Sequence, residues 1–324
     1  MREPWRNCSI WTPEVSRLAW GLLVGVLCAC SRSLPTPPSS PDAGGSSRYV
    51  PADGVPGCIL YSEPQHTGAV PPELPELSGL AASALHPGVF WAHNDSDNGF
   101  RLYAIDEGGK VLATLTLTGA SPLDLEDVAV GPCAPGQRAA SCVYLADIGD
   151  NLRDRQQVRL FRLPEPTQLA DATLPVEPLA FVYPDGHHDA EALIMNASTG
   201  QLAVITKTPE SLGDVYVLEN LRPGETGRAS RLGTLQAPSG VDRMTTGASL
   251  HPSGERLLLR TYTRVWEVRR PKAPDLAALM GGQVVEVPGA SQAQAEAIAF
   301  LADGDGYLLG SEFTGQPMYR TRCR

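Results

Sequence analysis

The feature that most constrains the fold is a motif that recurs five times along the chain. Each copy is a small or acidic residue followed by a short apolar run, a Gly/Pro turn, a second apolar run, a polar loop and a third run. The copies align on Ser78, Glu126, Glu191, Thr246 and Glu296, which are 48, 65, 55 and 50 positions apart. Self-similarity at such a period is typical of repeat architectures.

The runs within each copy predict strands. The second runs are continuously apolar, as expected of strands that are covered on both faces. The predicted second strands span 89–93, 142–147, 201–206, 256–261 and 307–312. The predicted third strands span 101–106, 158–163, 214–219, 264–269 and 317–322, and the fourth strands span 111–117, 178–183, 230–236 and 283–287. Four strands in about 50 residues form one blade of a β-propeller.

These repeats predict an all-β chain folded as a five-bladed β-propeller. The spacing of 65 between Glu126 and Glu191 leaves a six-bladed propeller as the alternative, although residues 163–185 contain only one clear strand. A β-sandwich or two smaller β domains would also accommodate many short strands. The 29 prolines and 32 glycines are spread between short apolar runs, which favours strands over helices. One short helix is expected at 274–280.

The last copy stops at Arg324 without a fourth strand, and the N-terminal run 57–61 can supply it. This strand would close the ring in the last blade and remove an exposed sheet edge. The expected domain keeps four cysteines, which allow three pairings. Cys133 and Cys142 flank a short loop between two strand-like runs and suggest a hairpin disulfide. Cys58 and Cys323 remain, and the proposed ring closure would place them on neighbouring strands.

The N-terminus indicates export. Basic residues precede an apolar run at 18–29 that is too short for a confident membrane span and has the layout of a secretory signal. The run ends in Leu27-Cys28-Ala29-Cys30, which resembles the lipobox of bacterial lipoproteins. We therefore expect a signal peptide at 1–29 and a lipid such as palmitate on Cys30, which would anchor the protein without spanning the membrane. A secreted protein cut elsewhere is the alternative.

The remaining chain divides into two parts. Residues 30–56 are rich in Pro, Ser and Gly and are expected to form a tether, and residues 57–324 would form the propeller. The net charge of −10 argues against nucleic acid or an anionic lipid surface as a partner, so cations and small ligands fit better. The sequence contains no nucleophile elbow, phosphate-binding glycine loop, H-E-x-x-H motif or dinucleotide fingerprint, which lowers the expectation of an enzyme.

One face of the predicted propeller would gather the starts of the innermost strands and the ends of the second strands. Three glutamates around one axis would repel each other, and a cation would offset that repulsion. Oxygen ligands of mixed type suit Ca²⁺ rather than Zn²⁺. The predicted metal ligands are Glu126, Asp147, Asp150, Asn151, Glu191 and Glu296. The residues predicted to bind a further ligand are His93, Asn94, Asp95, Lys207, Arg260 and Glu312.

Each of these residue groups also has a structural interpretation. Asp and Asn before Gly are common turn formers, so residues 147–151 could shape a loop. The repeated glutamates could accept hydrogen bonds from a neighbouring blade and lock the blades together. Lys207 and Arg260 could bind a phosphate or carboxylate, or could balance the glutamates. Of the adjacent His187 and His188, only one is expected to reach the channel, because neighbours on an extended chain point to opposite faces.

The spaced elements SGLA…WAHND, DLEDVA, YLADIGDN…R, DAEALI and AEAIAF look like those of a family of exported bacterial propellers. They are also distantly similar to phytase-like, esterase-like and gluconolactonase-like propellers, whose central acidic residues bind Ca²⁺. The resemblance spans about residues 58–324 and implies that Glu126, Asp147, Asp150, Asn151, Glu191 and Glu296 are channel residues. Ser78 and Thr246 stand where the other copies have Glu, which weakens transfer of a multi-calcium phytase site. Fold-level analogy is also a poor guide to reaction.

The sequence therefore predicts a monomeric protein of the bacterial cell envelope, tethered to a membrane through Cys30, that binds a cation and a small anionic ligand or an envelope partner. In the enzymatic alternative, a Ca-dependent phosphoesterase or lactonase, the catalytic candidates are Glu126, Asp147, Asp150, Lys207 and Arg260. The third alternative is a structural scaffold that binds other proteins through its rim loops.

Overall fold

The computed structural model describes residue 58 and residues 60–95, 98–137 and 140–324. The predicted signal peptide, Cys30 and the tether lie outside the described residues. Within the described part of the chain, no helix has the length and the apolar character needed to cross a membrane.

The described chain is all-β apart from one short helix, α1 (Leu276–Leu279), and it forms four sheets. The first sheet contains β2 (Leu77–Ala82), β3 (Val89–Asn94), β4 (Arg101–Asp106), β5 (Val111–Thr118) and β9 (Ala172–Pro175). An eight-stranded sheet contains β6 (Leu125–Pro132), β7 (Ser141–Asp147), β8 (Val158–Pro164), β10 (Glu177–Val182), β11 (Ala190–Asn196), β12 (Gln201–Thr206), β13 (Gly213–Leu218) and β14 (Thr226–Leu235).

The other two sheets have four strands each. One contains β15 (Thr245–Leu250), β16 (Arg256–Thr261), β17 (Val265–Arg269) and β18 (Gln283–Val287). The other contains β19 (Ala295–Phe300), β20 (Gly306–Ser311), β21 (Pro317–Arg322) and β1 (Gln65–Ala69), with β1 at the edge beside β21. These strands agree closely with the ranges predicted from the repeats, and α1 lies within the predicted helical segment.

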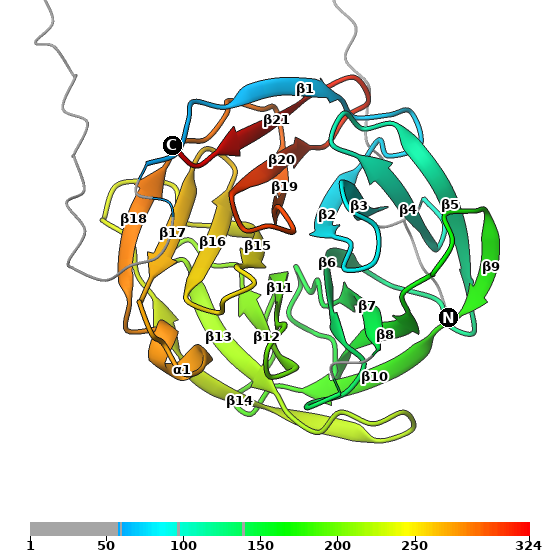
Figure 1. Cartoon of the computed structure of the whole chain (residues 1–324). Helices are drawn as coiled ribbons and strands as arrows, with labels where there is room; N and C mark the ends of the chain where they lie inside the picture. The colour runs from blue at the N-terminus through cyan, green and yellow to red at the C-terminus, as the bar shows by residue number, and fades with distance from the viewer. Residues whose placement is uncertain (1–57, 59, 96–97, 138–139) are drawn as a thin grey trace, which may run out of the picture. The chain divides into compact units, whose positions relative to one another are not determined.

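The sheets stand around a common centre, as in a propeller, and β2, β6, β11, β15 and β19 lie nearest to it (Figure 1). These innermost strands contact one another in that order, and β19 contacts β2. The core lies between neighbouring sheets, where Trp91 of β3 and Val143 of β7 belong to one buried cluster. The second strands are buried along almost their whole length, as their apolar sequences predict. The predicted all-β propeller architecture is therefore confirmed.

The long spacing between Glu126 and Glu191 is taken up at the outer edges of the sheets. In that stretch β9 pairs in parallel with β5, so it extends the first sheet. Parallel pairing of β10 with β14 then joins two strand groups into the eight-stranded sheet. The extra residues thus add outer strands, and no additional innermost strand is present among the described residues.

The N-terminal strand that pairs with β21 is not the predicted run 57–61. The pairing strand is β1, further along the chain, and Tyr61 forms only an isolated bridge with Cys323. Ser62 continues the contact, because its N–H donates to the Arg322 carbonyl at 2.7 Å and its Oγ accepts from the Arg322 N–H at 3.1 Å. Disulfides join Cys58 to Cys323 and Cys133 to Cys142, which are the pairings expected from the sequence.

Candidate functional site

The five residues on which the sequence repeats align share one structural position. In each innermost strand, the ladder to the second strand shifts register at this residue, which is the signature of a β-bulge. A bulge adds a residue to one strand and redirects its side chain. The residues on which the sequence repeats align therefore correspond to a bulge at the start of each innermost strand.

Two of the five bulge residues carry hydroxyl groups, and these join neighbouring innermost strands. Ser78 Oγ donates to the carbonyl of Glu126 at 2.5 Å, and Thr246 Oγ1 donates to the carbonyl of Ala295 at 2.9 Å. Both side chains are fully buried. The sequence suggested that the glutamates hydrogen-bond to a neighbouring blade. In the structure, Ser78 and Thr246 make such hydrogen bonds to the neighbouring innermost strand.

Glu126 lies in a group of carboxylates. One carboxylate oxygen from each of Asp95, Asp124 and Glu126 lies within 4.8 Å of the others, and we call these three residues the acidic cluster. Glu126 is only 6% exposed, and no described residue donates a hydrogen bond to its carboxylate. Gly149 packs against the cluster, since a Cβ at that position would stand 2.0 Å from Glu126 Oε1. Only glycine leaves room for these carboxylates.

Glu191 has a cationic partner. Lys207 Nζ donates to the Glu191 carboxylate and also to Tyr262 Oη at 2.8 Å. The same ammonium lies 5.1 Å from the centre of the Tyr262 ring, which adds a cation–π contact. Glu191 is buried and Lys207 is partly exposed, so this ion pair stands at the border between the site and solvent.

The third glutamate, Glu296, lies beside another carboxylate. It accepts a hydrogen bond from Gln294 Nε2 at 3.4 Å and is influenced by the charge of Glu312. Glu296 is buried, whereas Glu312 is partly exposed. No cation contacts this pair among the described residues.

Burial and neighbouring charges raise the pKa values of the three glutamates. Burial raises the pKa of Glu126 well above its ordinary value, and the charges of Glu191, Asp95, Asp124 and Asp189 raise it further. Burial raises the pKa of Glu296 to about 9, with an added contribution from Glu312. Burial likewise raises the pKa of Glu191 to about 7, although Lys207 opposes the rise. A group of carboxylates with raised pKa values is a candidate functional site.

Asp147, Asp150 and Asn151 shape the loop beside the cluster. Asp147 accepts the backbone N–H of Asp124 at 2.9 Å and lies 2.9 Å from Arg155 Nη2 and 3.2 Å from Arg159 Nε. Asp150 accepts the backbone N–H groups of Asp154 and Arg155, and Asn151 is exposed. The oxygens of both aspartates thus contact donors of the protein, and Asp147 orients Asp124.

The remaining predicted ligand-binding residues separate into two groups. Asp95 belongs to the acidic cluster, whereas Arg260 is fully buried and donates to Gln292 Oε1 at 2.8 Å and to the Ala290 carbonyl at 3.3 Å. Burial lowers the pKa of Arg260 to about 10. The ring of His93 is fully buried, which lowers its pKa to about 4, and its Nδ1 lies 2.8 Å from the Asn94 carbonyl.

The other polar side chains make local contacts. Asn94 accepts from the Glu76 N–H at 3.0 Å and donates to the Glu73 carbonyl at 2.9 Å. His187 Nδ1 lies 3.0 Å from the Arg153 carbonyl, and His188 Nε2 lies 3.0 Å from Asp185. His188 Nε2 also lies 3.0 Å from Tyr216 Oη of β13, and the described contacts of the two histidines do not include the acidic cluster.

Sequence reasoning missed Asp124, Asp189 and Tyr262. Asp189 accepts the backbone N–H of Asp150 at 2.9 Å, and its charge raises the pKa of both Glu126 and Glu191. A signal for the two aspartates was present, because each stands two positions before a register glutamate, in Asp124-Leu125-Glu126 and Asp189-Ala190-Glu191. No comparable pattern marked Tyr262, which comes from the loop after β16.

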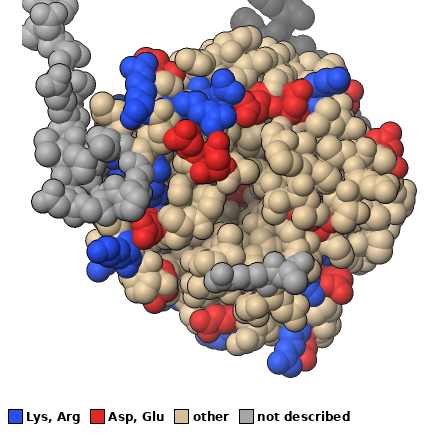
Figure 2. Space-filling model, in the orientation of Figure 1, with Lys and Arg blue, Asp and Glu red and all other residues tan. Residues whose placement is uncertain are grey.

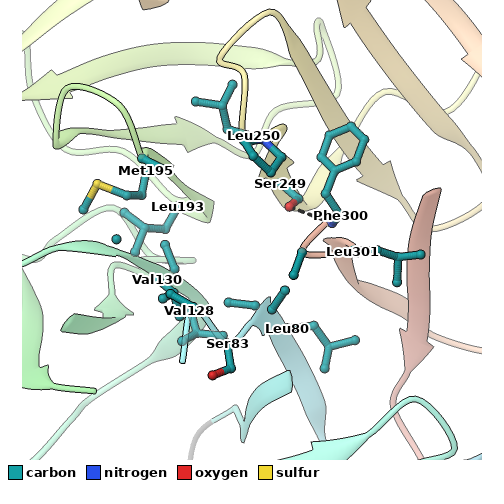
Figure 3. A pocket seen from close by; sticks show the side chains of 18 of the residues that line it. Leu80, Ser83, Val128, Val130, Leu193, Met195, Ser249, Leu250, Phe300 and Leu301 are labelled. Atoms are coloured by element: carbon teal, nitrogen blue, oxygen red, sulfur yellow. Dashed lines mark hydrogen bonds between the residues drawn. The ribbon is translucent and has the colours of Figure 1, made fainter. Parts of the chain in front are cut away.

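The later residues of the innermost strands line a second, apolar space. This cavity of about 220 Å³ is bordered by Leu80, Val128, Leu193, Leu250 and Phe300, among others (Figure 3). Its hydroxyl residues are turned to protein groups, since Ser83 Oγ donates to Glu165 and Ser249 Oγ accepts from the Phe300 N–H at 2.9 Å. The molecule is hollowed near its centre in Figure 2, and residues other than Lys, Arg, Asp and Glu form most of the border.

Comparison with known proteins leaves the family open. No family model matches the chain, and no curated protein matches its sequence. Among solved structures, the chain is similar to a gluconolactonase from Xanthomonas campestris, with 12% identity and a TM-score of 0.41. The match covers 80% of this chain and 88% of the gluconolactonase chain. At this level of similarity, the function has to be argued from the site itself.

Proposed function

We propose that this protein binds a divalent cation, Ca²⁺, at the acidic cluster. The observation that carries the proposal is the Glu126 carboxylate, which is 6% exposed, receives no hydrogen bond from a described residue and lies within 4.8 Å of two further carboxylates. Burying an ionised carboxylate without a partner is costly, and gathering several carboxylates adds repulsion. A cation removes both costs.

The ligand types favour calcium over other metals. The acidic cluster offers carboxylate oxygens, and it contains neither a histidine nor a cysteine. Oxygen ligands suit Ca²⁺ and Mg²⁺, and Ca²⁺ tolerates irregular geometry with several ligands, whereas Mg²⁺ demands a near-ideal octahedron. Glu191 lies close enough to affect the charge of Glu126, but it is paired with Lys207 and so serves as a neighbour rather than as a ligand.

The site belongs to an architecture that we infer to be five-bladed, with each bulge-bearing innermost strand starting one blade. The pairing of β1 with β21 and the Cys58–Cys323 disulfide support ring closure through the N-terminal end of the domain. We also propose that the domain is exported and held at a membrane by lipid on Cys30, with residues 30–56 as the tether. The oxidising compartment that such export implies is compatible with two disulfides.

A second candidate function is metal-assisted hydrolysis of a phosphoester or lactone. It is favoured by Glu191, whose pKa of about 7 suits a general base near neutral pH. In that case the cation would polarise the substrate oxygen, Glu191 would take a proton from water, and Lys207 with Tyr262 would stabilise negative charge.

Calcium titration followed by thermal unfolding tests the first proposal. We expect a saturable rise in the melting temperature of the wild-type protein, absent in Glu126→Gln and retained in the control Glu286→Gln. Glu286 is an exposed carboxylate that pairs with Arg264 on the protein surface. No shift with calcium in the wild type would refute the proposed cation site.

A panel of phosphoesters and lactones, assayed with calcium present, separates the two functions. Turnover that Glu191→Gln abolishes while calcium still stabilises the variant would establish the hydrolase. Calcium binding without turnover of any substrate would leave the protein as a cation-dependent binding module.

A further inference from the structure

Asp127 stands out among the residues that directly follow the register positions of the innermost strands. The residue after each register position is Gly79, Asp127, Ala192, Gly247 or Ala297, so four of the five are Gly or Ala. Strands approach closely at this level, since a Cβ on Gly247 would lie 2.4 Å from the Glu296 carbonyl oxygen. A single carboxylate therefore occupies a level that otherwise carries only glycine and alanine.

The Asp127 carboxylate accepts hydrogen bonds from three innermost strands. Its Oδ1 accepts the backbone N–H of Val128 at 2.8 Å. Its Oδ2 accepts the N–H of Leu193 in β11 at 2.8 Å and that of Ala248 in β15 at 3.4 Å. The residues that donate occupy equivalent places, each two positions after a register residue. Asp127 thus reaches from its own strand to the next two.

This carboxylate lies between the two spaces described above. Glu126 of the acidic cluster directly precedes Asp127. The three residues whose N–H groups Asp127 binds line the apolar cavity, and Figure 3 labels two of them, Val128 and Leu193; the third is Ala248. Asp127 is 1% exposed, and the three donors to its carboxylate are all backbone N–H groups. The side chain therefore contacts the backbone of residues that line the apolar cavity, and it directly follows a residue of the acidic cluster in the chain.

The Asp127 carboxylate accepts hydrogen bonds from backbone N–H groups that the sheets themselves leave unpaired. An innermost strand pairs on one side only, so part of its backbone N–H groups face the centre, and a buried N–H without an acceptor costs free energy. Charged acceptors form stronger hydrogen bonds with N–H groups than neutral acceptors do. A carboxylate placed among three N–H groups satisfies them together, and these N–H groups offset part of the cost of burying it.

We propose that the backbone N–H groups of Val128, Leu193 and Ala248 form a carboxylate-binding site whose resident ligand is the Asp127 side chain. By filling this site, Asp127 closes the channel between the acidic cluster and the apolar cavity and holds β6 and β11 so that Glu126 and Glu191 face the same space. Asp127 is a positioning residue in this role. The second part of the proposal rests on the proposed cation site, and the first part does not.

Chemical rescue of Asp127→Ala tests the site. The substitution removes the carboxylate and leaves a space in which formate can reach the same N–H groups. We expect the full-length variant to melt about 5–10 °C below the wild type, as the loss of several buried hydrogen bonds implies. Sodium formate should recover a saturable part of that loss, and sodium chloride at equal ionic strength should not. Equal effects of the two salts would overturn the proposal.

Asp127→Asn is the matched control, because it fills the space and keeps one acceptor while turning an NH₂ group toward backbone donors. It should melt below the wild type and show no response to formate. A wild-type melting temperature in this variant would overturn the proposal, and this comparison stands even if Asp127→Ala does not fold.

Calcium affinity then tests the positioning role. Asp127→Ala should bind calcium about tenfold more weakly than the wild type and regain affinity in formate. Glu126→Ala should also lose calcium affinity, and formate should not restore it. Recovery of stability without recovery of affinity would overturn the positioning role alone. If the wild type binds no calcium, the proposed cation site fails while the formate experiment still decides the carboxylate site.

Discussion

Two buried glutamates of this protein have opposite surroundings. Glu267 in β17 is fully buried and lies between Arg256, whose Nε is 2.6 Å from Oε1, and Arg269, which pairs with Oε2. Tyr61 Oη donates a further hydrogen bond to Glu267 at 3.2 Å. Glu126 is almost as buried, but it lies beside other carboxylates and has no cationic partner among the described residues.

The comparison separates a structural carboxylate from a candidate site. Burial alone does not distinguish the two glutamates. The two glutamates differ in their partners. Two arginines pair with Glu267, whereas no cation pairs with Glu126 among the described residues. An uncompensated buried charge has to be neutralised by a proton or by a bound cation. The following predictions test this contrast, from the largest expected effect to the smallest.

Glu267→Gln should be the most damaging change. It leaves two buried arginines without their carboxylate, and breaking a buried ion pair costs about 3–5 kcal/mol. Urea unfolding with and without calcium measures this loss, which should be the same in both conditions. Glu126→Gln in calcium-free buffer should instead be neutral or stabilising, because it removes repulsion. A similar loss of stability in Glu267→Gln and Glu126→Gln would contradict the proposed difference between the two residues.

The calcium-free protein should become less stable as pH rises through the neutral range. The folded-state pKa values of Glu191 and Glu296 are raised to about 7 and about 9, so folding favours their protonated forms. Their contribution to stability is complete below the ordinary glutamate pKa and is lost as pH rises through the folded values. Urea unfolding in chelator at pH 5, 7 and 9 measures the trend.

Calcium should offset part of that trend, since it binds the ionised carboxylates of the acidic cluster, in which burial raises the pKa of Glu126. Its affinity should rise over the same pH range, because protons then compete less well for the site. Glu126→Gln supplies the control, and its calcium-dependent stability should stay near zero at every pH. A calcium affinity that is independent of pH would contradict a raised pKa of Glu126 in the acidic cluster.

Lys207→Met should have a smaller effect that depends on pH. Lys207 compensates Glu191, and the loss of a charged hydrogen bond in a partly buried pair costs about 1–3 kcal/mol. The cost should be larger at pH 8, where Glu191 is ionised, than at pH 5, where it is protonated. Lys110→Met, which alters an exposed lysine, is the control. Equal costs at both pH values would show that Lys207 acts through packing alone.

Ser78→Ala should have the smallest effect. It removes the hydroxyl that donates to the Glu126 carbonyl and leaves that buried acceptor without its partner, at a cost of about 1–2 kcal/mol. Ser230→Ala in β14, an exposed position, should be within about 0.5 kcal/mol of the wild type. Urea unfolding measures both variants. An unchanged stability of Ser78→Ala would show that the Ser78 hydroxyl does not stabilise the contact between β2 and β6.

Much of the architecture could be predicted from the sequence, because repeats report local periodicity and turns. The second, third and fourth strands fall close to their predicted ranges, and the register residues occupy equivalent bulges. The N-terminal strand that pairs with β21 was misplaced, because a short apolar run before Pro64 looks as strand-like as β1, which contains His66, Thr67 and Gly68. Pairing with β21 selects between them, and that contact is distant in sequence.

The site was less predictable, since charge alone does not say which carboxylates are compensated. Asp147 and Glu126 look equivalent in the sequence, but Arg155 and Arg159 reach Asp147 and no cation reaches Glu126 among the described residues. Arg260 was expected at the channel face, and its guanidinium instead donates to Gln292 and Ala290.

The sequence by itself determined the repeated strands, the recurrent bulge residue and the cysteines available for pairing, because each depends on residue types at short, regular spacing. Only the tertiary structure decided which acidic side chains meet and which receive a compensating donor. Those contacts join loops and strands far apart in the chain, as when Asp127 takes the N–H of Ala248. Distances through space set electrostatic energies, and spacing along the chain does not.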